Sequence, residues 1–230
     1  MLAMGGVGLV ALGGAAYVAP PMMLRVVQTR RLARLCAQTR SLVLTYDDGP
    51  GRELTPRLLD LLAQRGAKAT FFLLGRRAQR EPTIADRLKG EGHEIGTHSQ
   101  EHLHAWKTPP GRWARDLAQG IETVARWNPR PIFRPPYGKI TTPGLIAARS
   151  WAPKLGWWTV DARDTWSPPR TPDEVAELAK QGGVVLLHDF DREGRAELVL
   201  DCTRRLLDLA DEQGLTVRRL GDVLGGVSDG

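Results

Sequence analysis

Short apolar runs alternate with helix-like segments along most of this chain of 230 residues. The runs predict strands at 41–46, 69–74, 94–97, 131–133, 155–160, 184–187 and 215–217. Each run is continuously apolar rather than alternating with polar residues, which is typical of parallel strands covered on both faces. About seven β/α units of this kind favour a compact α/β barrel, and an open parallel sheet is the alternative.

Two helices carry start signals. Thr55-Pro56 and Thr171-Pro172 each place a capping hydroxyl before a proline that suits the first helical turn. We therefore expect Thr55 and Thr171 to cap helices, and we expect Pro82 to interrupt a helix over residues 76–90.

The N-terminal stretch is uncharged. Residues 1–24 carry no charged side chain, whereas residues 25–40 are rich in arginine. Because about 20 apolar residues can span a bilayer, we expect a transmembrane helix or uncleaved signal over residues 1–24, broken near its end by Pro20-Pro21. A basic linker over residues 25–40 and a globular domain over residues 41–225 would follow. A buried helix of that domain is the alternative for the apolar run.

The net charge of +6 and the pI near 9.7 suit an anionic surface. No zinc-finger spacing, basic zipper region or RNA-binding signature is present, so we expect no nucleic-acid partner. The two cysteines, Cys36 and Cys202, form neither a metal-binding pattern nor a disulfide framework.

Polar residues stand where the apolar runs end. Asp47 and Asp48 follow the first run, His98 and His102 the third, and His188 the run at 184–187. In a β/α barrel these ends share one mouth. Adjacent carboxylates there need a cation or a proton between them. Two histidines and a carboxylate would form a catalytic metal site with open positions, if one helical turn points both imidazoles the same way. A solvated Asp-Gly-Pro turn and two unrelated histidines are the alternatives.

His188 has a separate interpretation. A histidine at the mouth can serve as a general acid when a carboxylate keeps it charged, and Asp164 is the candidate partner. A capping histidine without a catalytic role is the alternative.

Five motifs occur in a fixed order. They are Thr45-Tyr46-Asp47-Asp48-Gly49, His98-Ser-x-x-His102, Arg134-Pro-Pro-Tyr137, Asp161-x-x-Asp164 and Leu186-Leu-His188. Together they resemble the motifs of the polysaccharide deacetylase family, the NodB-homology carbohydrate esterases of family 4, over roughly residues 41–220. The resemblance implies a distorted (β/α)7 barrel. It also implies a metal-dependent hydrolase that removes N-acetyl groups from acetamido sugars of a polysaccharide or oligosaccharide, such as peptidoglycan or a chitin-like polymer.

The resemblance further implies a role for each matching residue. Asp47 would be the catalytic base and His188 the general acid. One divalent ion, zinc first and otherwise cobalt, manganese or nickel, would be held by Asp48, His98 and His102. Arg134 would orient the base and Asp164 would tune the acid. The substrate would contact Tyr137, Trp166 and Leu186. Thr165 stands directly after Asp164, where the family usually has a tryptophan.

Two other functions compete with this one. The chain could be an amidohydrolase acting on a lipid-linked sugar or a small amide, or an inactive barrel that only binds a ligand. The presence of Asp47, Asp48, His98, His102 and His188 argues against the inactive barrel, because a protein without catalytic function has no physical reason to keep unpaired buried charges. We expect an N-acetylated glycan as substrate and the membrane as a partner of residues 1–24. The location would be the cell envelope: the charge pattern favours a cytoplasmic domain by the positive-inside rule, and the habit of the family favours the outside.

Overall fold

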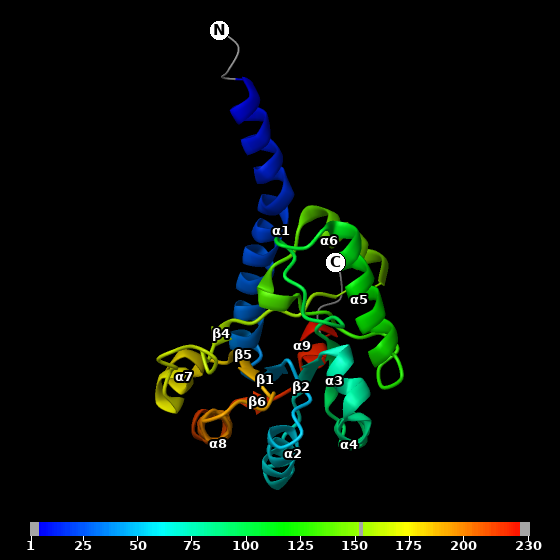
Figure 1. The fold of residues 1–230 in the computed structure, drawn as a ribbon. Helices are drawn as coiled ribbons and strands as arrows, with labels where there is room; N and C mark the ends of the chain where they lie inside the picture. The colour runs from blue at the N-terminus through cyan, green and yellow to red at the C-terminus, as the bar shows by residue number, and fades with distance from the viewer. Residues whose placement is uncertain (1–4, 152–153, 226–230) are drawn as a thin grey trace.

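The computed structural model describes residues 5–151 and 154–225 (Figure 1). In this part of the chain, six strands form one parallel sheet in the order β3-β2-β1-β5-β4, and β6 pairs with β1. The strands are β1 (Ser41–Asp47), β2 (Thr70–Leu73), β3 (Glu94–Thr97), β4 (Val160–Asp161), β5 (Gly183–His188) and β6 (Thr216–Val217). Strand β1 is buried along its whole length. The parallel α/β fold predicted from the continuous apolar runs is confirmed.

Two expected strands are much shorter than predicted. In place of a strand at 131–133, Phe133 forms single parallel bridges with Thr97 and Leu155. The prolines that surround Phe133 have no N–H to donate to a ladder, which limits the pairing there. The expected strand at 155–160 is reduced to the Leu155 bridge and to β4.

Residues 155–161 nevertheless bond to neighbours on both sides. The N–H of Gly156 donates to the carbonyl of Phe133 at 2.8 Å, and the N–H of Thr159 donates to the carbonyl of Val184 at 2.9 Å. The pairings therefore run from β5 through β1, β2 and β3 to Phe133, and on to residues 155–161 and back to β5. These are the bonds that a closed, distorted barrel requires.

Helices cover the sheet on both faces. They are α1 (Gly5–Gln38), α2 (Leu54–Gln64), α3 (Gly75–Arg80), α4 (Pro82–Gly90), α5 (Pro110–Val124), α6 (Thr142–Trp151), α7 (Pro172–Ala179), α8 (Ala196–Gln213) and α9 (Leu220–Gly225), with a 3-10 turn, η1 (Pro136–Gly138). Successive β1 side chains enter two apolar cores: Leu42 and Leu44 join the core containing α2 and α8, and Val43 joins the one containing α5 and α6. This two-sided burial explains the continuous apolar runs.

Helix α1 (Gly5–Gln38) differs from expectation. It continues through Pro20 and Pro21, which we expected to break it. A proline cannot donate to the carbonyl four residues earlier, so Ala16 and Tyr17 lose their intrahelical donors. The hydroxyl of Thr142, on α6, lies 2.8 Å from the Ala16 carbonyl and 3.1 Å from the Tyr17 carbonyl and bonds to both. The neighbouring helix thus replaces what the prolines remove.

The C-terminal half of α1 is also not the linker expected over residues 25–40. Leu32 and Cys36 are buried in the core that contains α5 and α6. The amide of Gln28 accepts a 2.6 Å hydrogen bond from the indole of Trp157. This half of the helix is part of the packed molecule, whereas the N-terminal turns of α1 project beyond it (Figure 1).

Within residues 5–151 and 154–225, no helix combines the length and the apolar sequence needed to cross a bilayer. The transmembrane helix expected over residues 1–24 is therefore not confirmed, and residues 1–4 of that segment lie outside the described part.

The two capping predictions have different outcomes. Thr171 caps α7 in a reciprocal capping box with Glu174, as predicted. Thr55 does not cap α2, because the helix already begins at Leu54. The carboxylate of Asp191, in the segment after β5, instead accepts the backbone N–H groups of Arg52 at 2.7 Å and Leu54 at 3.0 Å.

Candidate active site

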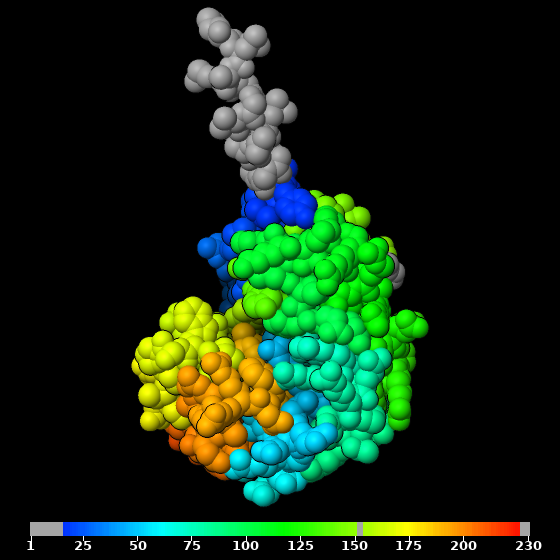
Figure 2. Space-filling view, viewed as in Figure 1, coloured from blue at the N-terminus to red at the C-terminus, as the bar shows by residue number. Residues whose placement is uncertain are grey.

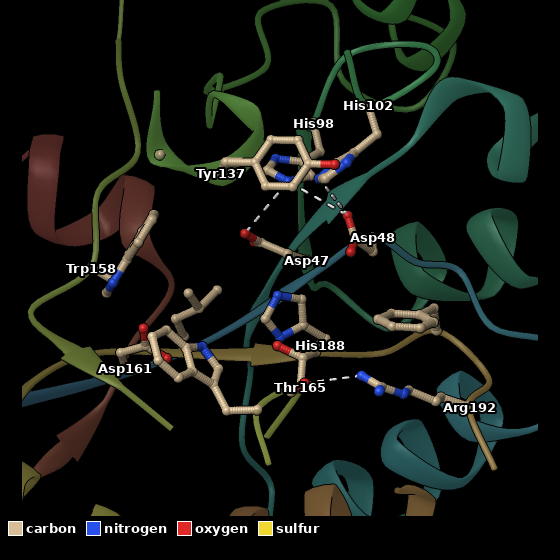
Figure 3. Close-up of a pocket in the computed structure, with 14 residues that line it drawn as sticks. Asp47, Asp48, His98, His102, Tyr137, Trp158, Asp161, Thr165, His188 and Arg192 are labelled. Carbon is tan, nitrogen blue, oxygen red and sulfur yellow. Dashed lines mark hydrogen bonds and ion pairs between the residues drawn. The ribbon is translucent and has the colours of Figure 1, made fainter. Parts of the chain in front are cut away.

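A pocket of about 430 Å³ opens at the carboxyl ends of β1, β3 and β5. Its lining comprises Asp47, Asp48, His98, His102, Tyr137, Gly138, Trp158, Asp161, Thr165, Trp166, Leu186, His188, Phe190 and Arg192 (Figure 3). The space-filling view shows this side of the molecule hollowed between the yellow and orange segments and the green segments (Figure 2). Parallel strands end at the same edge, which explains how motifs far apart in sequence meet here.

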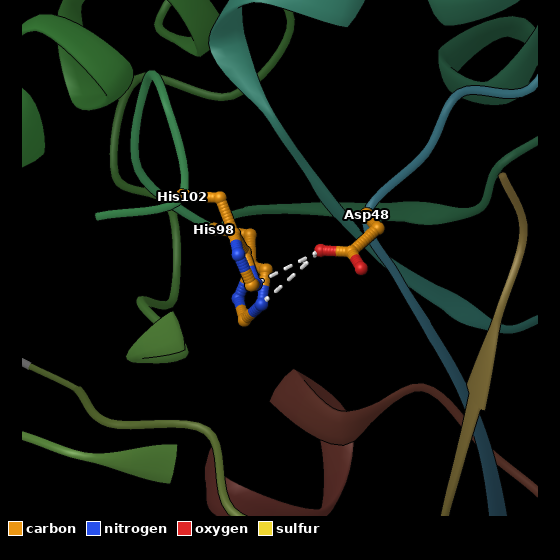
Figure 4. Close-up of side chains that lie close together, drawn as sticks. All are labelled: Asp48, His98 and His102. Carbon is orange, nitrogen blue, oxygen red and sulfur yellow. Dashed lines mark ion pairs between the residues drawn. The ribbon is translucent and has the colours of Figure 1, made fainter. Parts of the chain in front are cut away.

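Asp48, His98 and His102 form one cluster (Figure 4). Their candidate ligand atoms all lie within 4.8 Å of one another. The Asp48 Oδ1 atom is 3.2 Å from His102 Nε2 and 3.5 Å from His98 Nε2. It is buried and has no hydrogen-bond partner among the described residues. A buried carboxylate oxygen with no donor, facing two imidazole nitrogens, fits a divalent cation.

The protonation of His98 supports the same conclusion. Its Nδ1 lies 2.7 Å from the carbonyl of Arg134, which can only accept, so Nδ1 carries the proton and Nε2 keeps a free lone pair. Burial lowers the pKa of His98 to about 3, and burial also lowers the pKa of His102. Both rings are therefore neutral at neutral pH, the state in which imidazole binds a metal.

The two histidines do not share a helical turn, contrary to our expectation. They lie in a loop between β3 and α5, in which Ser99 and His102 have positive φ angles of 71° and 64°. Asp48 and Tyr137 have left-handed backbones as well, with φ angles of 69° and 58°. Non-glycine residues rarely adopt this conformation, and strain of this kind gathers at functional sites.

Asp47 lies beside the cluster and is held by Arg134. The Arg134 guanidinium is fully buried and donates to Asp47 Oδ1 at 2.7 Å and to the hydroxyl of Thr45 at 2.9 Å. It also donates to the carbonyls of Gly156 and Trp157. Burial raises the pKa of Asp47, and the charges of Arg134 and His188 act in the opposite sense. One oxygen of Asp47 is thus fixed by Arg134, while Oδ2 lies 3.7 Å from His98 Nε2.

His188 lies next to Asp47, because the two are register partners on β5 and β1. Its Nδ1 is 2.9 Å from Asp164 Oδ1, and its backbone N–H donates to Asp164 Oδ2 at 2.9 Å. Burial alone would lower the pKa of His188, but the nearby carboxylates, Asp164 first, outweigh it and raise the pKa to about 9. His188 is therefore a charged imidazolium at neutral pH.

All ten predicted site residues gather in this region. Eight of them line the pocket, while Arg134 and Asp164 lie behind its wall and hold Asp47 and His188 in place. Three lining residues with larger side chains were not predicted, namely Trp158, Phe190 and Arg192, and Asp161 was named in a motif but given no role. The position of Trp158 and Asp161 at the end of an expected strand was the available signal. Phe190 and Arg192 follow β5 in an irregular segment and have no comparable signal.

The chain matches the family model described as polysaccharide deacetylase over residues 34–153. It is 38% identical over 154 residues to a peptidoglycan-N-acetylglucosamine deacetylase of Bacillus cereus, a match covering 64% of this chain and 72% of the relative. It is 32% identical over 173 residues to a chitooligosaccharide deacetylase of Bradyrhizobium, covering 73% and 78%. The crystal structure of the Bc1960 peptidoglycan N-acetylglucosamine deacetylase has a TM-score of 0.72 at 29% identity, covering 80% of this chain and 88% of that one.

The range matched by the family model includes Asp47, Asp48, His98, His102 and Arg134. On the strength of the family model, the sequence relatives and the shared fold, the chain belongs to the polysaccharide deacetylase family.

Proposed function

We propose that this protein is a metal-dependent hydrolase that removes N-acetyl groups from acetamido sugars in a peptidoglycan-like or chitin-like polymer or oligomer. The observation that carries the proposal is the orphaned Asp48 oxygen facing two neutral histidines, with a separate carboxylate and a charged histidine in the same pocket. The relatives named above, which deacetylate peptidoglycan and chitooligosaccharides, support the substrate class.

Asp48, His98 and His102 would hold the ion, and zinc is our first choice because it favours nitrogen and oxygen ligands with an open position. A bound divalent cation would supply Lewis acidity at the acetyl carbonyl and at a water molecule.

The chain's own residues supply the proton transfers. Asp47 takes a proton from the attacking water, and its Oδ2 is the oxygen that faces the metal cluster. Arg134 holds the other oxygen of Asp47 and so fixes the direction of the base. His188, already charged through Asp164, gives its proton to the departing sugar nitrogen. Tyr137 offers its backbone N–H to the developing oxyanion.

The acetyl pocket would be formed by apolar walls. Leu186 and Trp166 line the pocket on the side of β4 and β5, and Trp166 is 55% exposed. We propose that Leu186 contacts the acetyl methyl group and that Trp166 covers the sugar. Because the proposed substrates are cell-wall glycans, we also propose that the protein works at the cell envelope, which fractionation of cells followed by immunodetection would test.

The decisive experiment compares two neighbouring carboxylates. The metal-stripped protein should release acetate from N-acetylglucosamine oligomers or peptidoglycan only after zinc, cobalt, nickel or manganese is added. The Asp47→Asn variant should lose turnover yet still bind one ion, whereas Asp48→Asn should lose both. Zinc content is measured by elemental analysis after desalting. Metal-independent acetate release, or loss of metal in Asp47→Asn with retention in Asp48→Asn, would overturn the assignment.

A further inference from the structure

We propose that a groove beside the active site binds a hydrocarbon chain attached to the acetamido sugar, so that amphiphilic, lipid-linked sugars are substrates besides the polymers and oligomers named above. The inference rests on the proposed deacetylase function and widens its substrate class. The groove lies between α1 and the loop after η1. It has a volume of about 340 Å³ and is lined by Pro21, Met22, Arg25, Val26, Trp106, Gly138, Lys139, Ile140 and Trp157.

The groove adjoins the catalytic pocket. Gly138 lines both cavities, and Trp157, which lines the groove, is followed directly by Trp158, which lines the pocket. The Arg25 guanidinium forms the partition between them: it donates to the carbonyl of Gly138 at 2.7 Å and stacks 4.5 Å from the Trp158 ring. A substituent on a sugar in the pocket would reach the groove by passing over this partition at Gly138, the residue that both cavities share.

The lining favours a hydrocarbon over a second sugar. Apart from Arg25, which already bonds to Gly138, its α1 side is apolar (Pro21, Met22 and Val26), and Lys139 is the other charged residue of the lining. Met22 and Val26 are 50% and 47% exposed and lie one helical turn apart on the same side of α1. A ligand that covers these half-exposed apolar side chains removes their apolar surface from water, which favours binding. We therefore expect an alkyl or isoprenoid chain to bind in the groove.

A cation, Lys139, lines the groove directly after Gly138, the residue that the two cavities share. The Lys139 ammonium lies 4.6 Å from the Trp106 ring centroid and 3.4 Å from His104 Nε2. Among the described residues, its contacts include no carboxylate partner. An anionic link between sugar and chain, such as a phosphate, would pair with this ammonium in the partly buried position that Lys139 occupies.

The test uses the wild-type holoenzyme with zinc and a series of N-acetylglucosaminides bearing methyl, hexyl or octyl chains, each below its micelle concentration. Acetate release should show KM falling by about tenfold or more from methyl to octyl, since each buried methylene strengthens binding. A phosphate-linked octyl substrate should gain further, and Lys139→Met should remove that additional gain only.

The helix offers a matched control. Met23 and Val27 are 69% and 63% exposed on the same helix but do not line the groove. The double variant Met22→Ser/Val26→Ser should lose the chain-length dependence, and Met23→Ser/Val27→Ser should keep it.

The outcomes distinguish failure of the groove assignment from failure of the proposed deacetylase function. Equal KM values along the series in an active wild-type enzyme would overturn the groove assignment and leave the deacetylase function standing. If both double variants lost the dependence of KM on chain length to the same extent, the groove assignment would also be overturned. Absence of acetate release from every substrate, glycan oligomers included, would instead overturn the proposed function.

Discussion

The charge on His188 depends on Asp164. Asp164 contacts both the ring and the backbone N–H of His188, and this carboxylate contributes most to raising the pKa of His188 to about 9. Since a general acid must be protonated to act, activity should fall as pH rises through the pKa of His188.

Asp164→Asn should therefore lower kcat/KM by about 10²-fold and move the alkaline limb of its pH profile to lower pH. Asp161→Asn is the control, because Asp161 lines the same pocket without bonding to His188. The measurement is kcat/KM for acetate release between pH 5 and 10 (roughly the working range of such assays). An unchanged alkaline limb in Asp164→Asn would contradict the role given to Asp164.

Asp189 is a buried carboxyl that the proposed chemistry does not use. It is fully buried and bonds to the hydroxyl of Thr55, and its Oδ1 has no partner among the described residues. Burial, with the nearby charges of Asp48 and Asp47, raises its pKa from 3.8 to about 7. The folded state therefore binds more protons than the unfolded state between these two values, so Asp189 lowers stability as pH rises from about 4 to about 7.

Asp189→Asn should remove this pH dependence. In the metal-free protein, the variant should match the wild type in Tm near pH 3 (below both pKa values of the carboxyl) and exceed it above pH 7. Thermal melts in matched buffers measure this difference, and the exposed Glu193→Gln serves as control. A variant whose Tm is lower than that of the wild type above pH 7 would contradict the prediction.

Residue chemistry was easier to predict than residue conformation. The acids and histidines were identifiable because each follows an apolar run. Nothing in the spacing of His98 and His102 indicated a loop with two left-handed residues instead of a helical turn. The sequence also did not indicate that Asp191, rather than Thr55, accepts the first N–H groups of α2, because Asp191 lies 137 residues from Leu54 in sequence.

At the scale of elements, α1 is the main departure from expectation. From sequence, the apolar residues 1–24 with Pro20 and Pro21 near their end predicted a membrane segment with a break in its helix. The structure has a continuous helix because a hydroxyl on α6 satisfies the freed carbonyls, and a single sequence does not show such a contact between distant segments. The strands with long apolar runs were predictable, and the proline-flanked run at 131–133 was not.

Leu32→Ala tests whether α1 belongs to the folded core. Leu32 is 5% exposed and packs in the core that contains Trp113 and Phe133. Removing its side chain should lower the free energy of unfolding by about 2–4 kcal/mol, measured by denaturant titration. Arg31→Ala, at an exposed position on the same helix, should change it by less than about 0.5 kcal/mol. Equal effects of the two substitutions would mean that α1 is not packed as described.

At the scale of the whole molecule, the proposed metal should couple to stability. A ligand that binds only the folded state at 100 times its Kd stabilises that state by about 2.7 kcal/mol. Chelation should therefore lower the Tm, and added zinc should restore it.

Two neighbouring histidines make this prediction specific. His102→Ala should abolish the response of Tm to zinc, whereas His104→Ala should keep it, because His104 is outside the Asp48, His98 and His102 cluster. Calorimetric melts with and without zinc provide the measurement. Retention of the full response in His102→Ala would contradict the assigned ligand set.

The carboxylate of Asp191 joins two parts of the molecule that carry opposite catalytic roles. The segment that follows Asp48 begins α2, and the segment that follows His188 supplies the acceptor for its first N–H groups. The amide protons of Arg52, Glu53 and Leu54 should therefore exchange slowly with deuterated water, although Arg52 and Glu53 lie at the surface. Faster exchange of these amides with saturating substrate than without it would show that the contact between the segments following the base and the acid opens more often while the enzyme works.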